Sequence, residues 1–310
     1  MRHQSQTFNL FVLLFSAVTI ISSLLIPGFM TDAVPWFLFV SVVVLGIPHG
    51  AIDHIIAGDI YGFKNRLRDH LLFYSSYLLV MLAVGLLWFF APAAGMIFFL
   101  LISVYHFGQS DAVAMLHSSN RWITWFTWVR GTAVIGLIIF ATPEVALPII
   151  ETAIRRDPGW FDLLYRYSGF ISLSIVLIYS VFILFAGFVA DLKMKKSQFY
   201  IDSVILIFLF YATDPLIAFA VYFALWHSAG HVQEMINFFA KQGRDISIPE
   251  FYKLALPFTG VSLVGLLLLF YIYRTFSFEN EMISLLFILI SVLTLPHMLV
   301  VDKMFKSTQS

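Results

Sequence analysis

The chain has 310 residues, of which 60% are hydrophobic and only 12% are charged, and its formal net charge is zero. Soluble domains carry roughly a quarter charged residues, so this composition favours a lipid bilayer as the solvent. No basic tail or basic helix offers contacts to phosphates, which excludes a nucleic-acid partner. Because the chain has no cysteine, disulfides, iron–sulfur clusters and cysteine-based zinc sites are also excluded, and any metal must use His, Asp, Glu or Tyr.

Apolar runs of about 20 residues, the length that crosses the hydrocarbon core as a helix, recur along the chain. The first is too long for a signal-peptide core, so we expect it to be retained. The seventh is the shortest, and its separation from the eighth depends on the turn signal Thr213-Asp214-Pro215, without which nine spans would follow. Bracketed by charged or Pro/Gly-marked breaks, these runs predict ten spans, near residues 8–30, 33–57, 70–90, 93–116, 122–142, 166–190, 198–212, 215–240, 254–274 and 282–302.

The distribution of positive charge predicts the topology of this bundle. With ten spans and a cytoplasmic N-terminus, thirteen Lys and Arg residues fall in connections on the cytoplasmic side and four on the opposite side. This asymmetry follows the positive-inside rule and predicts that both termini are cytoplasmic. The longest piece outside the spans, about 143–165, is too short to fold alone. We therefore expect residues 1–310 to form a single all-α transmembrane domain, a polytopic helical bundle in the inner (cytoplasmic) cell membrane.

Six of the nine histidines lie inside predicted spans. The spans that carry them are all even-numbered and run in the same direction, so residues at similar fractions of their length lie at similar depth. Five of the six then form one layer, in the centre and the cytoplasmic half of the bilayer. A lone histidine there could serve as an interhelical hydrogen-bond partner. Five at one depth indicate a functional site instead. The layer consists of His49 (second span), His106 (fourth), His227 and His231 (eighth) and His297 (tenth). His54, also in the second span, lies outside it.

The spacing of these residues is typical of a metal site. His227 and His231 are four residues apart, so both imidazoles lie on one helix face and can bind one ion. With His49 and His106 they form a set of four nitrogen ligands. Ligating imidazoles usually donate their second N–H to a carboxylate. Carboxylates follow four of the histidines, and Asp53 and Glu234 have the better spacing for this role, while Asp111 and Asp302 either serve the site or mark the cytoplasmic interface.

Residues next to the histidines suggest local irregularity and a hydrophobic pocket. Gly46, Pro48 and Gly50 flank His49, so we expect the second span to be kinked or locally unwound there. Aromatic side chains close to the histidines are candidates for lining a pocket for a flat apolar substrate, although periodicity alone does not distinguish a pocket from packing. They are Tyr105, Phe107, Tyr222 and Trp226. No phosphate-binding loop, serine triad or dinucleotide fingerprint is visible.

Four separated segments carry these histidines. In this order they resemble the Brp/Blh family of bacterial and archaeal membrane β-carotene 15,15'-dioxygenases, over nearly the whole chain. The segments are Gly46-Ile-Pro-His-Gly-Ala-Ile-Asp-His54, Tyr105-His-Phe-Gly-Gln-Ser-Asp111, Trp226-His-Ser-Ala-Gly-His-Val-Gln-Glu234 and Leu295-Pro-His-Met-Leu-Val-Val-Asp302.

The resemblance implies an Fe(II)-dependent enzyme that cleaves β-carotene at its central double bond with O₂ and gives two molecules of retinal. The product would supply a retinal-binding microbial rhodopsin. The resemblance also implies that His49, His106, His227 and His231 bind the iron, and the other two histidines inside predicted spans, His54 and His297, are added as supporting or alternative ligands. Four imidazoles on six-coordinate iron leave two open positions, and a substrate dissolved in the bilayer can enter such a site laterally.

Two other functional classes remain open on the sequence. A membrane di-iron desaturase or hydroxylase also uses histidine motifs, although only His227 and His231 match its HxxxH spacing and it needs more ligands. A transporter of divalent metal ions or protons would use intramembrane histidines as a relay, and helices broken at Pro48 and Pro215 are compatible with it. Haem ligation by two of the histidines is a further possibility. Stoichiometric iron together with retinal formation distinguishes the dioxygenase from these classes.

Overall fold

The computed structural model describes residues 6–64, 66–117, 121–154, 159–275 and 282–309. All of its regular elements are helices, as predicted, and one isolated bridge joins Leu116 and Leu192. The described residues form two compact units. Unit 1 comprises residues within Met1–Leu45, Ser103–Pro148 and Asp157–Gln233, and unit 2 comprises those within Gly46–Ile102, Ile149–Arg156 and Glu234–Ser310. The expectation of a single domain stays a prediction.

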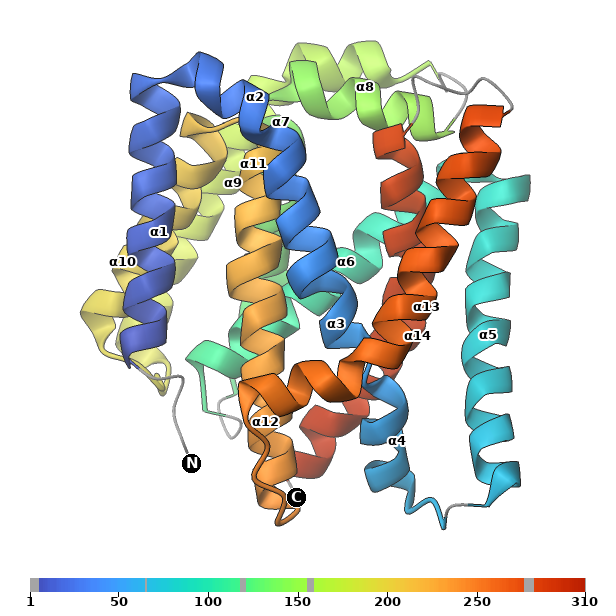
Figure 1. The fold of residues 1–310 in the computed structure, drawn as a ribbon. Helices are drawn as coiled ribbons and strands as arrows, with labels where there is room; N and C mark the ends of the chain where they lie inside the picture. The colour runs from blue at the N-terminus through green and yellow to red at the C-terminus, as the bar shows by residue number, and fades with distance from the viewer. Residues whose placement is uncertain (1–5, 65, 118–120, 155–158, 276–281, 310) are drawn as a thin grey trace. The chain divides into compact units, whose positions relative to one another are not determined.

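Unit 1 is a bundle of packed helices (Figure 1). Helix α7 packs against α9 and α10, α10 also packs against α1 and α9, and α11 packs against α2 and α7. Its principal elements are α1 (Gln6–Leu25), α2 (Pro27–Phe39), the second half of α6 (Pro92–Met115), α7 (Ile123–Phe140), α9 (Phe161–Val189), α10 (Lys196–Ala212), α11 (Pro215–Val221) and the π-helix η2 (Tyr222–Ser228).

The backbones of α6 and α7 come into direct contact in unit 1. A Cβ atom added to Gly108 would overlap the carbonyl group of Thr127, and one added to Gly131 would overlap the carbonyl group of Val104. Small residues that allow such close approach are typical of helix packing in membranes, where no hydrophobic driving force brings helices together. This contact holds the helix that carries His106 firmly against its neighbour.

Unit 2 contains the remaining helices. Helix α14 packs against α4 and α5, and α13 packs against α3. A buried hydrogen bond from Nε1 of Trp88 to Oγ of Ser291, 2.9 Å long, links α5 to α14. Gly62, with a φ of 62°, ends α4 in the left-handed conformation that glycine adopts readily. The elements are α3 (Ile47–Gly50), α4 (Asp53–Tyr61), α5 (Leu67–Phe90), α13 (Ile248–Thr275), α14 (Met282–Gln309) and most of α12 (Ala229–Lys241), while the π-helix η1 (Val40–Gly46) and α8 (Pro143–Ile154) each contribute to both units.

Nine helical segments in the described part of the chain are long and apolar enough to cross a membrane, so this is a multi-pass membrane protein. Of the ten predicted spans, the seventh, near 198–212, corresponds to α10, which has 17 residues and lies outside that set. The break between α10 and α11 is confirmed, because Pro215 begins α11 and the Asp214 side chain caps it by accepting a hydrogen bond from the backbone N–H of Leu216 at 2.8 Å. The cytoplasmic location of both termini stays a prediction.

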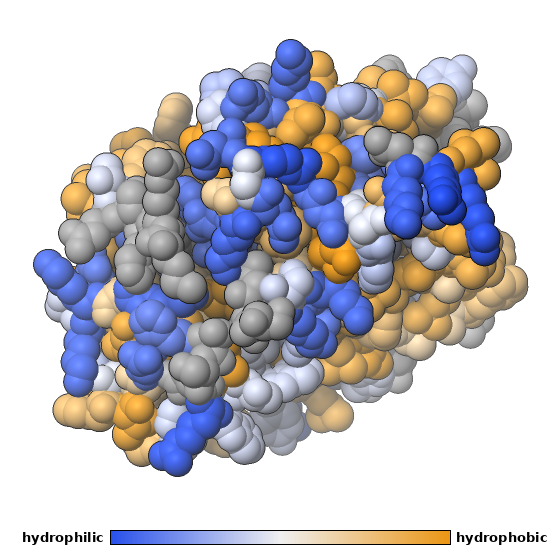
Figure 2. Space-filling model, turned by 90° about the horizontal axis from the view of Figure 1, so that it is seen from below, coloured by the Kyte–Doolittle hydropathy of each residue, from blue (hydrophilic) through white to orange (hydrophobic). Residues whose placement is uncertain are grey.

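The surface of the helices fits this environment. Large apolar side chains such as Leu14, Phe89 and Phe170 are exposed on α1, α5 and α9, as expected for residues that face lipid. Hydrophilic side chains gather on the face seen in Figure 2.

The predicted irregularity of the second span is confirmed. The π-helix η1 ends at Gly46, three residues before His49, and a turn at Ala51 and Ile52 separates α3 from α4. A second π-helix, η2, contains His227. Because π-helical turns are rare and occur frequently at functional sites, their presence at two of the histidine motifs supports a functional role for each of these motifs.

Candidate metal centre

Three histidines predicted as ligands converge in unit 1. His106 projects from α6, His227 from η2 and His231 from α12, and all three are buried. One ring nitrogen of each lies within 4.8 Å of the others. The ring centroids are 4.8 Å apart for His106 and His227, 5.1 Å for His106 and His231, and 4.6 Å for His227 and His231. We call these three residues the histidine cluster.

The donor set of the histidine cluster fits a first-row transition metal. Imidazole nitrogen is a good ligand for iron, zinc, copper and nickel, whereas magnesium and calcium prefer oxygen. Nitrogens that share one such ion lie about 3 to 4 Å apart, and the upper limit of 4.8 Å found here is compatible with this spacing. Within the described residues this is the one group of three or more His, Asp or Glu side chains close enough to hold a metal ion.

Apolar rings pack against the cluster. The ring of Phe107 lies 4.5 Å from that of His227, and Phe223 stacks on His227 at 5.4 Å with nearly parallel planes. Phe219 in turn stacks on Phe223 at 5.4 Å. These buried rings keep water away from one side of the cluster and provide the kind of surface that a hydrocarbon contacts well.

Two other predicted site residues come together in unit 2. His49 and His297 are both buried, and their rings meet edge to face with centroids 4.7 Å apart. The carboxylate of Asp53 lies 2.9 Å from Nδ1 of His297 and accepts a hydrogen bond of 2.9 Å from the Tyr77 hydroxyl. Asp53, selected for its spacing from His49, thus has His297 as a partner. Because His49 belongs to unit 2, its role as a fourth ligand stays a prediction.

His54 and Glu234 occupy different surroundings. His54, the one intramembrane histidine placed outside the predicted layer, packs at 4.5 Å against the ring of Phe258 and lies 6.3 Å from that of Tyr74. Glu234 is partly buried and follows His231 by three residues in α12. The supporting roles that the sequence suggested for both residues stay predictions.

The four aromatic residues proposed as pocket lining differ in their surroundings. Phe107 contacts the histidine cluster directly. Tyr105 packs on Trp128 at 5.6 Å and its hydroxyl accepts a hydrogen bond from the amide of Gln109. Tyr222 and Trp226 are buried and direct their polar groups to carboxylates. The contact with substrate that the sequence suggested for these four residues stays a prediction.

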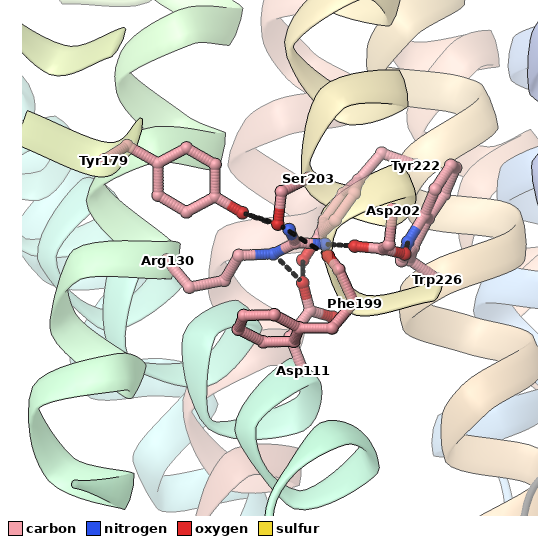
Figure 3. A network of polar contacts seen from close by, with 8 residues as sticks. All are labelled: Asp111, Arg130, Tyr179, Phe199, Asp202, Ser203, Tyr222 and Trp226. Atoms are coloured by element: carbon pink, nitrogen blue, oxygen red, sulfur yellow. Dashed lines mark hydrogen bonds and ion pairs between the residues drawn. The ribbon is translucent and has the colours of Figure 1, made fainter. Parts of the chain in front are cut away.

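A buried ionic network lies in unit 1, and the sequence argument did not predict it (Figure 3). The guanidinium of Arg130, fully buried on α7, donates to Oδ2 of Asp111 at 2.6 Å and to Oδ1 of Asp202 at 2.8 Å. It also donates to the hydroxyl of Tyr179, which itself hydrogen-bonds Oγ of Ser203 at 3.0 Å. We call Arg130, Asp111 and Asp202, with their hydrogen-bonded partners Tyr179, Ser203, Tyr222 and Trp226, the Arg130 network.

The reading of Asp111 as a marker of the cytoplasmic interface is wrong, because its carboxylate is buried in an ion pair. Asp302, by contrast, pairs with the exposed Lys306 at 2.6 Å, as expected near an interface. The signal for the network was present in the sequence. Arg130 and Asp202 are charged residues inside predicted spans, and such residues face the protein interior and pair with each other.

A small cavity of about 30 Å³ adjoins the two carboxylates of the network. Polar groups of Asn9 and Gln198 contribute to its lining, together with Trp226. This volume holds roughly one or two water molecules, so it does not serve as the binding pocket of a large organic substrate.

The chain is similar to known proteins over most of its length. A family model described as beta-carotene 15,15'-dioxygenase matches residues 40–305, which include all four histidine segments. The chain is 26% identical over 282 residues to a beta-carotene 15,15'-dioxygenase from an uncultured marine bacterium, 66A03, covering 89% of this chain and 96% of the relative. It is also 26% identical over 293 residues to a probable beta-carotene 15,15'-dioxygenase, Blh, from Halobacterium salinarum, covering 86% of this chain and 83% of the relative. No solved structure matches this chain.

Proposed function

The chain belongs to the β-carotene 15,15'-dioxygenase family, and we propose that it performs the reaction at a metal ion held by His106, His227 and His231. The enzyme cleaves β-carotene to retinal. The observation that carries the metal assignment is the convergence of three buried imidazoles, two of them four residues apart in the chain and the third from another helix.

We propose Fe(II) as the ion. The cluster offers neutral nitrogen donors, which suit Fe(II), and a ligand set of three or four imidazoles leaves positions open for O₂. When bound, the ion supplies the redox chemistry that allows O₂ to react with a carbon–carbon double bond. His49 is the proposed fourth ligand, from its place in the sequence motif.

The chain's own residues bind the ion, orient its ligands and exclude water. One molecule of O₂ supplies both carbonyl oxygens of the two products, so no proton or reductant is consumed and no acid–base pair is needed. Because β-carotene has no hydrogen-bonding group, its recognition depends on shape and on apolar contacts. Phe107 and Phe223, which pack on His227, are the proposed contacts nearest the reacting bond.

The proposal is tested by expression in bacteria that accumulate β-carotene, followed by purification. Loss of the orange colour, appearance of retinal, and about one tightly bound iron per chain are the expected results. Replacement of His227 by Ala should leave the colour unchanged while the protein still inserts into the membrane. Two irons per chain would favour the di-iron class, and metal-dependent transport without retinal formation would favour the transporter. A Soret band in the purified protein would indicate haem.

A further inference from the structure

The Arg130 network connects two of the three elements that carry the histidine cluster, α6 and η2. Asp111 lies five residues after His106 on α6, and Oδ2 of Asp111 accepts hydrogen bonds from Arg130 and, at 3.3 Å, from the hydroxyl of Tyr222. Oδ2 of Asp202 accepts from Nε1 of Trp226 at 2.7 Å. Since Tyr222 and Trp226 belong to η2, the network holds the π-helix from which His227 projects.

Two neighbouring faces of η2 have different roles in this arrangement. On one face the rings of Tyr222 and Trp226 stack at 6.1 Å, and their polar groups bind the carboxylates (Figure 3). On the other face Phe223 stacks on His227 at 5.4 Å, next to the other two histidines. A π-helical segment is an uncommon backbone form that needs support from its surroundings. The hydrogen bond from Trp226 to Asp202 supplies such support one residue before His227, and the bond from Tyr222 to Asp111 supplies it five residues before His227.

We propose that Arg130 is a positioning residue for the metal centre. Its guanidinium holds Asp111 and Asp202 in one arrangement, and these carboxylates fix the rotation of η2 and so the direction of the His227 ring. The inference rests on the proposed function, because it assumes that the histidine cluster binds a metal.

A purely structural role would predict something different. Buried ion pairs often add little to stability compared with apolar side chains, although breaking one is costly. If the network served only to neutralise Arg130 within the membrane, the loss of any one of its hydrogen bonds would lower stability in the same way and leave metal binding unaffected. The positioning role predicts that the bonds to η2 matter for the metal and that those on the side of α9 do not.

Two matched variants separate these roles. Trp226→Phe removes the N–H that binds Asp202 and keeps an aromatic ring beside Tyr222. Tyr179→Phe removes a hydroxyl that binds the same Arg130 from α9, along with its hydrogen bond to Ser203. Both variants weaken the same network, but only the hydrogen bond lost in Trp226→Phe ties down the helix that carries His227.

The experiment measures binding of Co(II) to the full-length, detergent-solubilised protein after removal of its own metal, by visible absorption and by titration. We expect Trp226→Phe to weaken Co(II) affinity by about 10- to 100-fold, the usual cost of losing a group that supports a metal ligand, and to change the absorption spectrum. Tyr179→Phe should retain Co(II) affinity within about twofold, because Tyr179 does not support a metal ligand. The thermal midpoints of the two metal-free variants should decrease by similar amounts.

Equal Co(II) affinity in Trp226→Phe and the unaltered protein would overturn the positioning role, as would an equal loss in both variants. If Trp226→Phe does not fold, Tyr222→Phe, which loses only the hydroxyl bonded to Asp111, is held to the same expectation. Failure of the unaltered protein to bind Co(II) would instead contradict the metal assignment itself. The two failures are therefore distinguishable.

Discussion

Asp53 of α4 and His297 of α14 form a buried pair, with the carboxylate oxygens 2.9 and 3.0 Å from Nδ1 of the imidazole. A carboxylate in this position fixes the tautomer, because it favours the proton on Nδ1 and leaves the lone pair on Nε2. Imidazoles with such a carboxylate partner are common around metal ions, and His49 lies edge-on against this one. The pair therefore links two of the histidine motifs through direct contact.

Asp53→Asn should weaken the pair of residue 53 with His297 without abolishing metal binding by the histidine cluster. We expect a loss of unfolding free energy of about 1–3 kcal/mol, since the charged acceptor of two buried partners is replaced by a neutral one. Retinal formation should fall but persist. Tyr77→Phe, which removes one hydrogen bond to the same carboxylate, is the control and should cost about 1 kcal/mol. A thermal midpoint of Asp53→Asn equal to that of the unaltered protein would contradict the expectation.

Single replacement of His106, His227 or His231 by Ala should abolish retinal formation and stoichiometric iron binding. The same result is expected for His49→Ala if it is the fourth ligand, whereas His54→Ala and His297→Ala should be milder. Because a metal that binds only the folded protein stabilises it by mass action, adding Fe(II) or Co(II) at about 100 times its dissociation constant should stabilise the unaltered protein by about 2.7 kcal/mol.

This stabilisation by metal provides a check that does not depend on activity. It should vanish in the three alanine variants of the histidine cluster, measured as the shift of the thermal midpoint. Full activity in any one of them would remove that residue from the ligand set. Iron loss in His54→Ala or His297→Ala as complete as in His227→Ala would show that the division between ligands and supporting residues is wrong.

Glu234 tests the supporting role of a carboxylate one turn beyond His231. Glu234→Gln keeps the size and an acceptor oxygen but loses the charge, so weakened iron binding and partial turnover are expected. Glu234→Ala should lose more of both, within the 10- to 100-fold range typical of such partners. Iron content and turnover of the Ala variant at the level of the unaltered protein would instead indicate that Glu234 only extends toward the cytoplasmic interface.

Close contact between α6 and α7 predicts a strong effect of a single methyl group. Gly131→Ala would place a Cβ atom onto the carbonyl group of Val104, and backbone atoms cannot move aside as a side chain can. We expect a loss of about 3 kcal/mol or more, the upper range for overpacking, with displacement of His106 and loss of iron. Gly169→Ala in the exposed part of α9, where a Cβ meets nothing within 4 Å, should leave stability unchanged or slightly raised. Comparable midpoints for the two variants would contradict the close contact.

The sequence by itself determined the membrane class and most of the span boundaries. The free energy of transferring a segment into hydrocarbon is close to a sum over its residues, so it can be evaluated from local sequence alone. It also determined that His227 and His231 share a helix face, since a spacing of four residues is a local property of a helix. The break before Pro215 was predicted for the same reason, as a cap and a proline act on the turn that contains them.

Only the tertiary structure decided which side chains are partners across helices. Asp53 was selected for its spacing from His49, yet it binds His297, which is 244 residues away. Arg130 and Asp202 lie 72 residues apart, and no periodicity within either helix indicates that they meet. These pairings depend on how neighbouring helices are rotated and how closely their backbones approach, as at Gly108 and Gly131, and both depend on side-chain packing between segments remote in sequence.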